Sequence, residues 1–224
     1  DSLHMVVTLT ILILLTLGLA ALVVGPRTVA RQVVFNEAPD TPAPFGPEMA
    51  WLAVKTEDTA ALLHALGLTE HRAANWQSGI GTIYDAKLAD GHVFVTPPVA
   101  GWTFVAGVAL PMPAGPNFVD KLMPMLEALA PETAHVQYFG TFPSIDYFAW
   151  ARFDGGRLVR AFAIGEAGVL WSAGRQTSDE VALGLRMYDV RGIERRKGDA
   201  GGALHIHPTQ AHVLRLARAW GLSP

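Results

Sequence analysis

The chain has 224 residues, of which 50% are hydrophobic and only 17% are charged. This composition excludes a disordered or collagen-like protein and is more apolar than that of a typical soluble domain. The formal net charge of −3 offers no basic excess to neutralise a phosphate backbone, so nucleic acid is not an expected partner. Cysteine is absent, which excludes disulfides, thiolate metal sites and cysteine nucleophiles. Composition favours a membrane-attached globular protein but identifies no reaction.

The excess of hydrophobic residues is concentrated near the start of the sequence. Residues 5–25 (MVVTLTILILLTLGLAALVVG) carry no charge. As a helix they would extend about 30 Å, which matches the hydrocarbon thickness of a bilayer. A cleaved signal peptide usually has a shorter apolar core, and a buried soluble helix usually shows a polar stripe. The segment therefore predicts one transmembrane helix.

Residues 26–48 are expected to join this helix to a globular part. Arg27 and Arg31 follow the apolar run and are placed at the level of the lipid headgroups. The stretch from Asn36 to Glu48 contains four prolines, which predict an extended and fairly stiff tether. The globular part is expected to occupy residues 49–224, which is long enough for one sizeable core.

Apolar periodicity and turn signals divide this globular part into strands and helices. The sequence Asp154-Gly155-Gly156 predicts a tight hairpin between two strands. Direct hairpins and irregular alternation with helices favour an α+β domain with an antiparallel or mixed sheet. The expected strands are 49–56, 92–96, 102–110, 134–139, 146–153, 157–164 and 168–172. The expected helices are 57–66, 118–129 (with Pro124 kinking or shortening it), 178–185 and 209–220.

Four segments of the globular part resemble a group of uncharacterised bacterial proteins. They are VFVTPPVAGWTFVAGVALP, VQYFGTF, DYFAWARFDGGRLVRAFAIGEAGVLWSAG and HVLRLARAWGLSP, which begin at residues 93, 136, 146 and 212. The shared residues are Trp, Gly and Pro at strand ends. The group has no established activity, so the resemblance implies no catalytic residue. Some relatives look like small soluble proteins of immunity or defence neighbourhoods, and the span at 5–25 suggests recruitment of such a domain to a membrane.

Three histidines near the end of the sequence form the best candidate metal site. His205 and His207 would lie on the same face of a strand, and His212 could return from the following helix. No acidic residue lies within this stretch to complete the ligand set. We therefore favour a polar strand edge and a helix start over a metal centre, and we expect no cofactor.

Acidic residues that could serve in acid–base catalysis are scattered near strand ends. They are Asp85, Asp90, Asp146, Asp154 and Glu166. A turn already accounts for Asp154, and no nucleophile elbow, metalloprotease or nucleotide-binding motif accompanies the others. The pair Gly79 and Gly81 is too short a pattern to indicate a dinucleotide site. We expect no catalytic site.

A basic cluster and the tryptophans are the remaining candidate contact residues. The cluster could meet anionic lipid or an acidic partner, although the glycines that follow it favour a solvated loop. It consists of Arg191, Arg195, Arg196 and Lys197. Most of the six tryptophans are expected in the core, with one or two left as interface anchors.

These observations favour a non-catalytic, single-span accessory subunit of a larger bacterial membrane complex. Photosynthetic and respiratory assemblies are the first hosts to consider, because such complexes often carry single-span extra subunits. The expected partners are other membrane subunits and lipid, with no small-molecule substrate. Two alternatives remain open: a membrane-tethered binding or immunity-type protein, and a metal-dependent enzyme that uses the three histidines.

The arginines flanking the apolar run bear on membrane orientation. Arg27 and Arg31 follow the run, and no Lys or Arg precedes it in the sequence. The positive-inside rule then predicts an inner-membrane protein whose globular domain is cytoplasmic. The difference is only two charges, and Glu37 and Asp40 follow soon after, so a periplasmic domain stays open as the alternative.

Overall fold

The computed structural model describes residues 35–113, 120–129, 131, 133–166, 168–185 and 208–222. These residues belong to one compact unit. Among them, no helix has the length and apolar character needed to cross a membrane. The predicted span at residues 5–25 lies outside the described residues.

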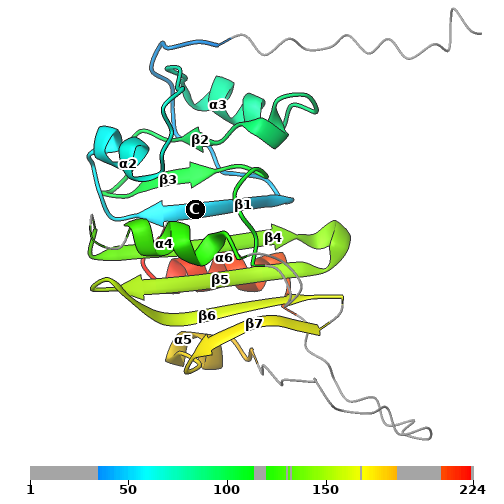
Figure 1. The fold of residues 1–224 in the computed structure, drawn as a ribbon. Coiled ribbons are helices and arrows are strands. Elements are labelled where there is room, and N and C mark those ends of the chain that lie inside the picture. Colours follow the sequence, from blue (N-terminus) through cyan, green and yellow to red (C-terminus); the bar gives the residue numbers. More distant parts are fainter. Residues whose placement is uncertain are drawn as a thin grey trace, which may run out of the picture. The chain divides into compact units, whose positions relative to one another are not determined.

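Seven strands form one sheet in which every neighbouring pair is antiparallel. Their order is β2-β3-β1-β4-β5-β6-β7, so the first strand lies near the middle (Figure 1). The strands are β1 (Met49–Val54), β2 (Phe94–Val95), β3 (Thr103–Ala106), β4 (His135–Phe142), β5 (Tyr147–Asp154), β6 (Arg157–Gly165) and β7 (Gly168–Gly174). The antiparallel form of the prediction is confirmed.

Helices pack on both faces of the sheet (Figure 1). The α-helices are α2 (Thr59–Ala65), α3 (Trp76–Ile83), α4 (Leu122–Leu129), α5 (Ser178–Ala182) and α6 (Gln210–Ala219). Short 3-10 turns, η1 and η2, occupy Ala89–Gly91 and Pro143–Ile145. Residues of α2 and α4 share one core with the sheet, and residues of α3 and α6 share the other. The α+β class is therefore confirmed for the domain.

The alternation of side chains along β1 creates these two cores. Met49, Trp51 and Ala53 face α3 and α6, whereas the residues between them face α2 and α4. In register with Trp51, the α6 face carries Phe139, Trp150 and Phe162 on successive strands. The rings of Trp51 and Phe139 stack at 5.3 Å, and those of Trp150 and Phe162 lie 4.9 Å apart. This aromatic row gives the α6 face much of its buried area.

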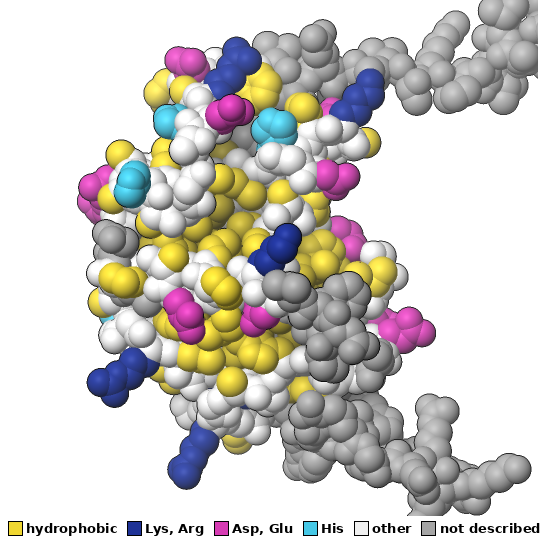
Figure 2. Space-filling model, in the orientation of Figure 1, with side chains coloured by type: hydrophobic (Ala, Val, Ile, Leu, Met, Phe, Trp, Pro, Cys, Tyr) yellow, Lys and Arg dark blue, Asp and Glu magenta, His cyan; other side chains and the backbone are white. Residues whose placement is uncertain are grey.

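The opposite face is covered by α2 and α4 and has more partly buried apolar side chains than the α6 face. Leu122, Leu126 and Leu129 of α4 are buried against it. Figure 2 looks onto this side and shows hydrophobic side chains gathered over the sheet around α4. The predicted start of this helix at residue 118 lies outside the described residues. Pro124 is the third residue of α4, within the first turn, where no intrahelical N–H is required.

The predicted hairpin between β5 and β6 is confirmed. Gly155 and Gly156 have φ of 56° and 74°, the left-handed values that a type I′ turn requires at both central positions. Strand β3 ends at Ala106, earlier than expected, whereas β4 continues to Phe142. Helix α3 was not predicted, because Gly79 and Gly81 interrupt its apolar pattern.

Candidate functional site

The segment predicted as a tether is docked on the domain where the structure describes it. We call residues 35–48 the strap. Asn75 at the start of α3 donates its backbone N–H to the carbonyl of Asn36 at 2.7 Å, and its side-chain amide to the carbonyl of Ala38 at 2.9 Å. Ser78 donates its hydroxyl to the same Asn36 carbonyl at 3.2 Å. The strap therefore packs along α3. The packed unit thus starts before the predicted boundary at Met49.

Asp40 of the strap caps the N-terminus of α3. Its two carboxylate oxygens accept hydrogen bonds from the backbone N–H groups of Trp76 and Gln77, both at 2.8 Å. Asn75 is the N-cap residue, and its side-chain oxygen accepts from the N–H of Ser78 at 3.0 Å. The first turn of a helix has N–H groups without intrahelical partners and a positive end of the dipole. The Asp40 carboxylate accepts hydrogen bonds from these N–H groups and places a negative charge at the positive end of the dipole. The strap and α3 therefore stabilise each other.

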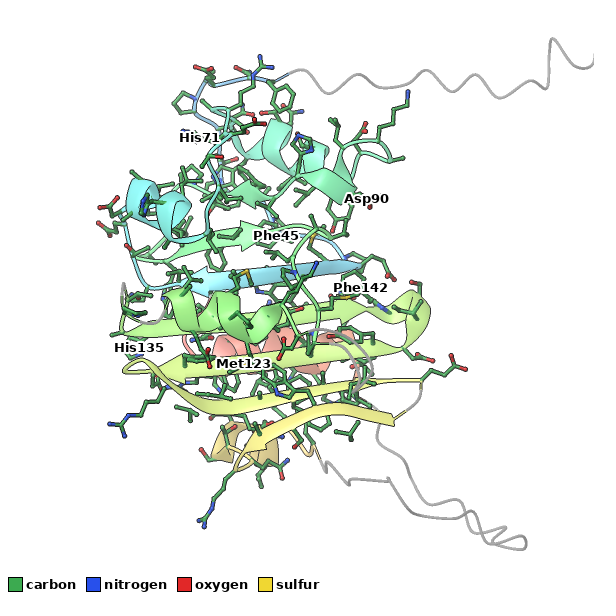
Figure 3. All side chains as sticks on the ribbon, viewed as in Figure 1. Phe45, His71, Asp90, Met123, His135 and Phe142 are labelled. Atoms are coloured by element: carbon green, nitrogen blue, oxygen red, sulfur yellow. The ribbon has the colours of Figure 1, made fainter. Side chains whose placement is uncertain are left out.

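Aromatic side chains hold the second half of the strap. Phe45, which Figure 3 labels, stacks on Trp76 with ring centroids 6.3 Å apart and meets Phe104 of β3 edge-on at 6.1 Å. Tyr84, just after α3, donates its hydroxyl to the carbonyl of Pro47 at 2.9 Å. Burial raises the pKa of the Tyr84 hydroxyl, with a smaller contribution from nearby Glu48. The phenol therefore keeps its proton for this hydrogen bond at neutral pH.

A buried ion pair lies on the same face of the sheet, the α6 face, but toward the opposite edge. Arg160 of β6 and Glu180 of α5 are 3% and 0% exposed, and their Nε and Oε1 atoms are 2.9 Å apart. Glu180 also accepts from the indole N–H of Trp150 at 2.8 Å and from the backbone N–H of Thr177 at 2.6 Å. The guanidinium donates through Nη1 to the carbonyls of Ala161 and Ala173. Both charged groups of the pair thus have several polar partners, as burial of charge requires.

A second charged group lies at the ends of β4 and β5. His135 Nδ1 and Arg152 Nη2 contact the two carboxylate oxygens of Asp154 at 2.7 and 2.8 Å. Burial alone would raise the pKa of Asp154, but the hydrogen bonds from His135 and Arg152 outweigh it and lower that pKa. The Arg152 guanidinium also lies 5.7 Å from the ring of Trp220, after the end of α6. The turn therefore explains only part of the role of Asp154.

Of the three histidines that the sequence suggested as metal ligands, only His212 is among the described residues. His205 and His207 lie outside the described residues. His212 lies in the first turn of α6, where its Nδ1 accepts the backbone N–H of Thr209 at 3.1 Å. Across the part of the chain that the structure describes, no three His, Asp or Glu side chains are grouped as metal ligands would be.

The predicted acidic residues are not brought together. Asp85 follows α3, Asp90 lies in η1, Asp146 follows η2 with a φ of 49°, and Glu166 is exposed in the β6–β7 turn. Figure 3 shows Asp90, His71 and His135 at separate places on the domain. The basic residues Arg191, Arg195, Arg196 and Lys197, and the interfacial Arg27 and Arg31, lie outside the described residues.

Most tryptophans are buried, as the sequence predicted. Trp51, Trp76, Trp150 and Trp220 are at most 6% exposed, whereas Trp102 and Trp171 are partly exposed. Trp102 lies beneath Lys55, whose ammonium is 4.9 Å from the ring centroid. Sequence reasoning missed the pairs Arg160–Glu180 and His135–Asp154 and the cap by Asp40, because nothing in the local pattern indicates partners so far apart in the chain.

Comparison with known proteins adds no assignment. The chain matches no protein-family model, and neither the curated proteins nor the solved structures include a significant match.

Proposed function

We propose that this protein is a non-catalytic, single-span accessory subunit of a bacterial membrane complex, with a photosynthetic or respiratory assembly as its host. The observation that carries the proposal is the strap, which ties the α+β domain to the segment leading from the apolar run at residues 5–25. Asp40, Asn36 and Phe45 fix that segment along α3. An anchor joined in this way positions the domain, which is what an accessory subunit requires.

The length of the connection sharpens the proposal. Only residues 26–34 separate the end of the apolar run from Phe35, and a chain of that length reaches at most about 35 Å. Because the strap is fixed against α3, its residues do not lengthen this connection. An anchored domain would therefore work within a short distance of the bilayer, against the extramembrane parts of neighbouring subunits. The two arginines at 27 and 31 favour the cytoplasmic side of the inner membrane.

The charged groups of the domain support a structural role. Both oxygens of Asp154 are taken by His135 and Arg152, and those of Glu180 are taken by Arg160, Trp150 and Thr177. A general acid or base needs a proton-transfer atom directed at a substrate. These carboxylates are instead directed at other parts of the fold, where they hold strands and helices together.

Purification of the tagged full-length protein from its native membranes tests this function. In a mild detergent we expect it to migrate with one large complex in a fixed stoichiometry. Release as a monodisperse monomer would contradict the proposal. Bound metal in stoichiometric amount, lost when His205 and His207 are both replaced by Ala, would favour the metal-dependent enzyme instead.

The membrane anchor has its own test. Leu14→Arg places a charge near the middle of the apolar run and is expected to cost about 2.5–3.5 kcal/mol of insertion free energy. This variant should leave the membrane fraction, whereas the matched variant Leu14→Val should remain. Equal integration of both would refute the span. Protease added to spheroplasts should leave a cytoplasmic domain uncut and should digest it in inverted vesicles, and the reverse pattern would place the domain in the periplasm.

A further inference from the structure

The outer edge of β7 is the most open part of the sheet among the described residues. Strand β7 pairs with β6 on one side only, and it forms no other backbone-to-backbone hydrogen bond to the described residues. Its sequence, GVLWSAG, contains neither a charge nor a proline. Natural sheets usually protect a long edge with lysine, proline, a β-bulge or a covering element. Among the described residues β7 has only a bulge, at Leu170, so most of its edge presents N–H and C=O groups suited to another strand.

Contacts from the rest of the domain involve only the end of β7. The Arg160 guanidinium lies on the α6 face of the sheet and donates to the carbonyls of Ala173 and Gly174, at 3.1 and 3.5 Å. Helix α5, which follows β7, packs against α6 and is held there by the Arg160–Glu180 pair. The described residues thus occupy the last part of the strand and leave Gly168–Ser172 without an edge partner.

A bulge places two large apolar side chains beside the open edge. Ala163 pairs with Trp171 and Ile164 pairs with Val169, so Leu170 is an additional residue in β7. Leu170 and Trp171 both pack against the α4-face core, and both are partly exposed. A strand added at this edge would cover part of both side chains, which would add apolar contact to backbone pairing.

The charges at the two ends of β7 are of opposite sign. Glu166 is exposed just before the strand, and Arg175 is exposed just after it. Neither forms an ion pair with another described residue. If a second β7 runs antiparallel about a two-fold axis near Leu170 or Trp171, the end bearing Arg175 lies beside the Glu166 end of the other copy. The two ends are therefore complementary in charge across such an axis.

We propose that two copies of this protein associate through their β7 edges, which pair antiparallel about a two-fold axis and join the two sheets into one. The contact is isologous, so it closes on itself and yields a dimer rather than a fibre. It goes beyond the role of accessory subunit and does not depend on which complex the anchor serves.

Cysteine cross-linking of the full-length protein in detergent tests this arrangement. Because the chain contains no cysteine, any cross-link reports the introduced thiol alone. Ser172→Cys places an exposed thiol one or two residues from the axis, where the two copies are too far apart for a direct disulfide but within reach of a short bis-maleimide, which should give a covalent dimer. Thr69→Cys, an exposed site after α2, is the matched control and should stay monomeric. A dimer linked equally well through both sites, or through Thr69→Cys alone, would overturn the proposal.

Charge exchange provides a second and independent measurement. Glu166→Arg or Arg175→Glu alone places like charges together twice in the dimer and should raise its dissociation constant about 3- to 10-fold. The double exchange should restore it to within about 2-fold of the parent. Self-association through β7 would be overturned by a parent that sediments as a monomer at every concentration, or by a dimer indifferent to these changes. It would also be overturned if the Ser172→Cys variant cross-linked only to a co-purified subunit.

Discussion

The two edge strands of this sheet, β2 and β7, differ in length and in the elements that pack beside them. The β2 edge is only two residues long, and α3 packs beside it, fastened by the strap. The β7 edge is seven residues long and uncharged, and the polar contacts near it are directed inward to hold α5. Within the described residues neither edge pairs with a further strand, but the β2 edge is very short and lies beside α3, whereas the β7 edge is longer and without charge.

The difference also concerns how each region is stabilised. At the strap, the polar contacts are hydrogen bonds to a partly buried helix start, each worth on the order of 1 kcal/mol. Beside β7, a buried guanidinium and a buried carboxylate depend on each other, and the loss of either leaves a charge without compensation. We therefore expect the strap to detach in small steps and α5 to be lost in one large step.

The largest effect is expected when the buried pair near β7 is broken. Glu180→Ala leaves the Arg160 charge buried and should lower the free energy of unfolding by about 3–5 kcal/mol. Urea unfolding followed by tryptophan fluorescence measures this loss. The double variant Arg160→Met with Glu180→Leu removes both charges and should be less destabilised than Glu180→Ala. If the double variant loses as much as the sum of Arg160→Met and Glu180→Leu measured singly, the pair is not coupled.

An intermediate effect is expected beside the β2 edge. A Cβ at Gly79 would lie 2.3 Å from the ring of Phe94, so Gly79→Ala forces α3 and β2 apart. Such overpacking costs about 1–3 kcal/mol, and the better helix propensity of Ala offsets part of it. Gly91→Ala is the matched control, because a Cβ there meets nothing within 4 Å. Equal stability of the two variants would show that α3 is not tightly packed on β2.

A smaller effect is expected at the strap itself. Asp40→Ala removes two hydrogen bonds to the start of α3 and should cost about 1 kcal/mol. Asp58→Ala is a matched control, because Asp58 caps α2 through the N–H of Ala61 at 2.9 Å without involving the strap. Hydrogen exchange at residues 36–48 should accelerate in the first variant only. Similar exchange in both would mean that Asp40 does not hold the strap.

The smallest effect concerns Asp154, between these two regions. Its pKa is lower in the folded protein than the value of about 3.9 expected when unfolded, so the ionised form stabilises the fold. This stabilisation is complete above the unfolded pKa and is lost as pH falls through the folded pKa. The difference in unfolding free energy between the parent and Asp154→Asn should therefore be larger at pH 7 than at pH 3. A difference that grows on acidification would contradict the assigned direction.

Local sequence patterns predicted most elements of the fold. The hairpin at Gly155–Gly156 and the strands on either side were predicted closely, because two glycines with positive φ define one kind of turn. Helix α6 was predicted from its amphipathic period, and Val213 and Ala217 are indeed buried. Helix α3 could not be predicted from propensity, since its two glycines disfavour a helix that Asn75, Asp40 and the Phe94 ring stabilise from outside.

The candidate sites were harder to predict than the fold. The residues chosen from sequence were neighbours in the chain or acids at strand ends, and the described ones do not meet. The pairs that do meet are 19 and 20 residues apart, His135 with Asp154 and Arg160 with Glu180. Such pairs depend on which strands are adjacent and on which face a later helix packs.

By itself, the sequence determined the properties that arise between near neighbours: the uncharged run at residues 5–25, the turns, the strand alternation and the α+β class. The tertiary structure decided the order of strands, the docking of the strap on α3, the burial of Arg160 with Glu180 and the openness of β7 among the described residues. The physical reason is that steric and periodic preferences act over a few residues. The free energy of a cap, a buried charge or a sheet edge depends instead on a partner that only the folded chain brings into contact.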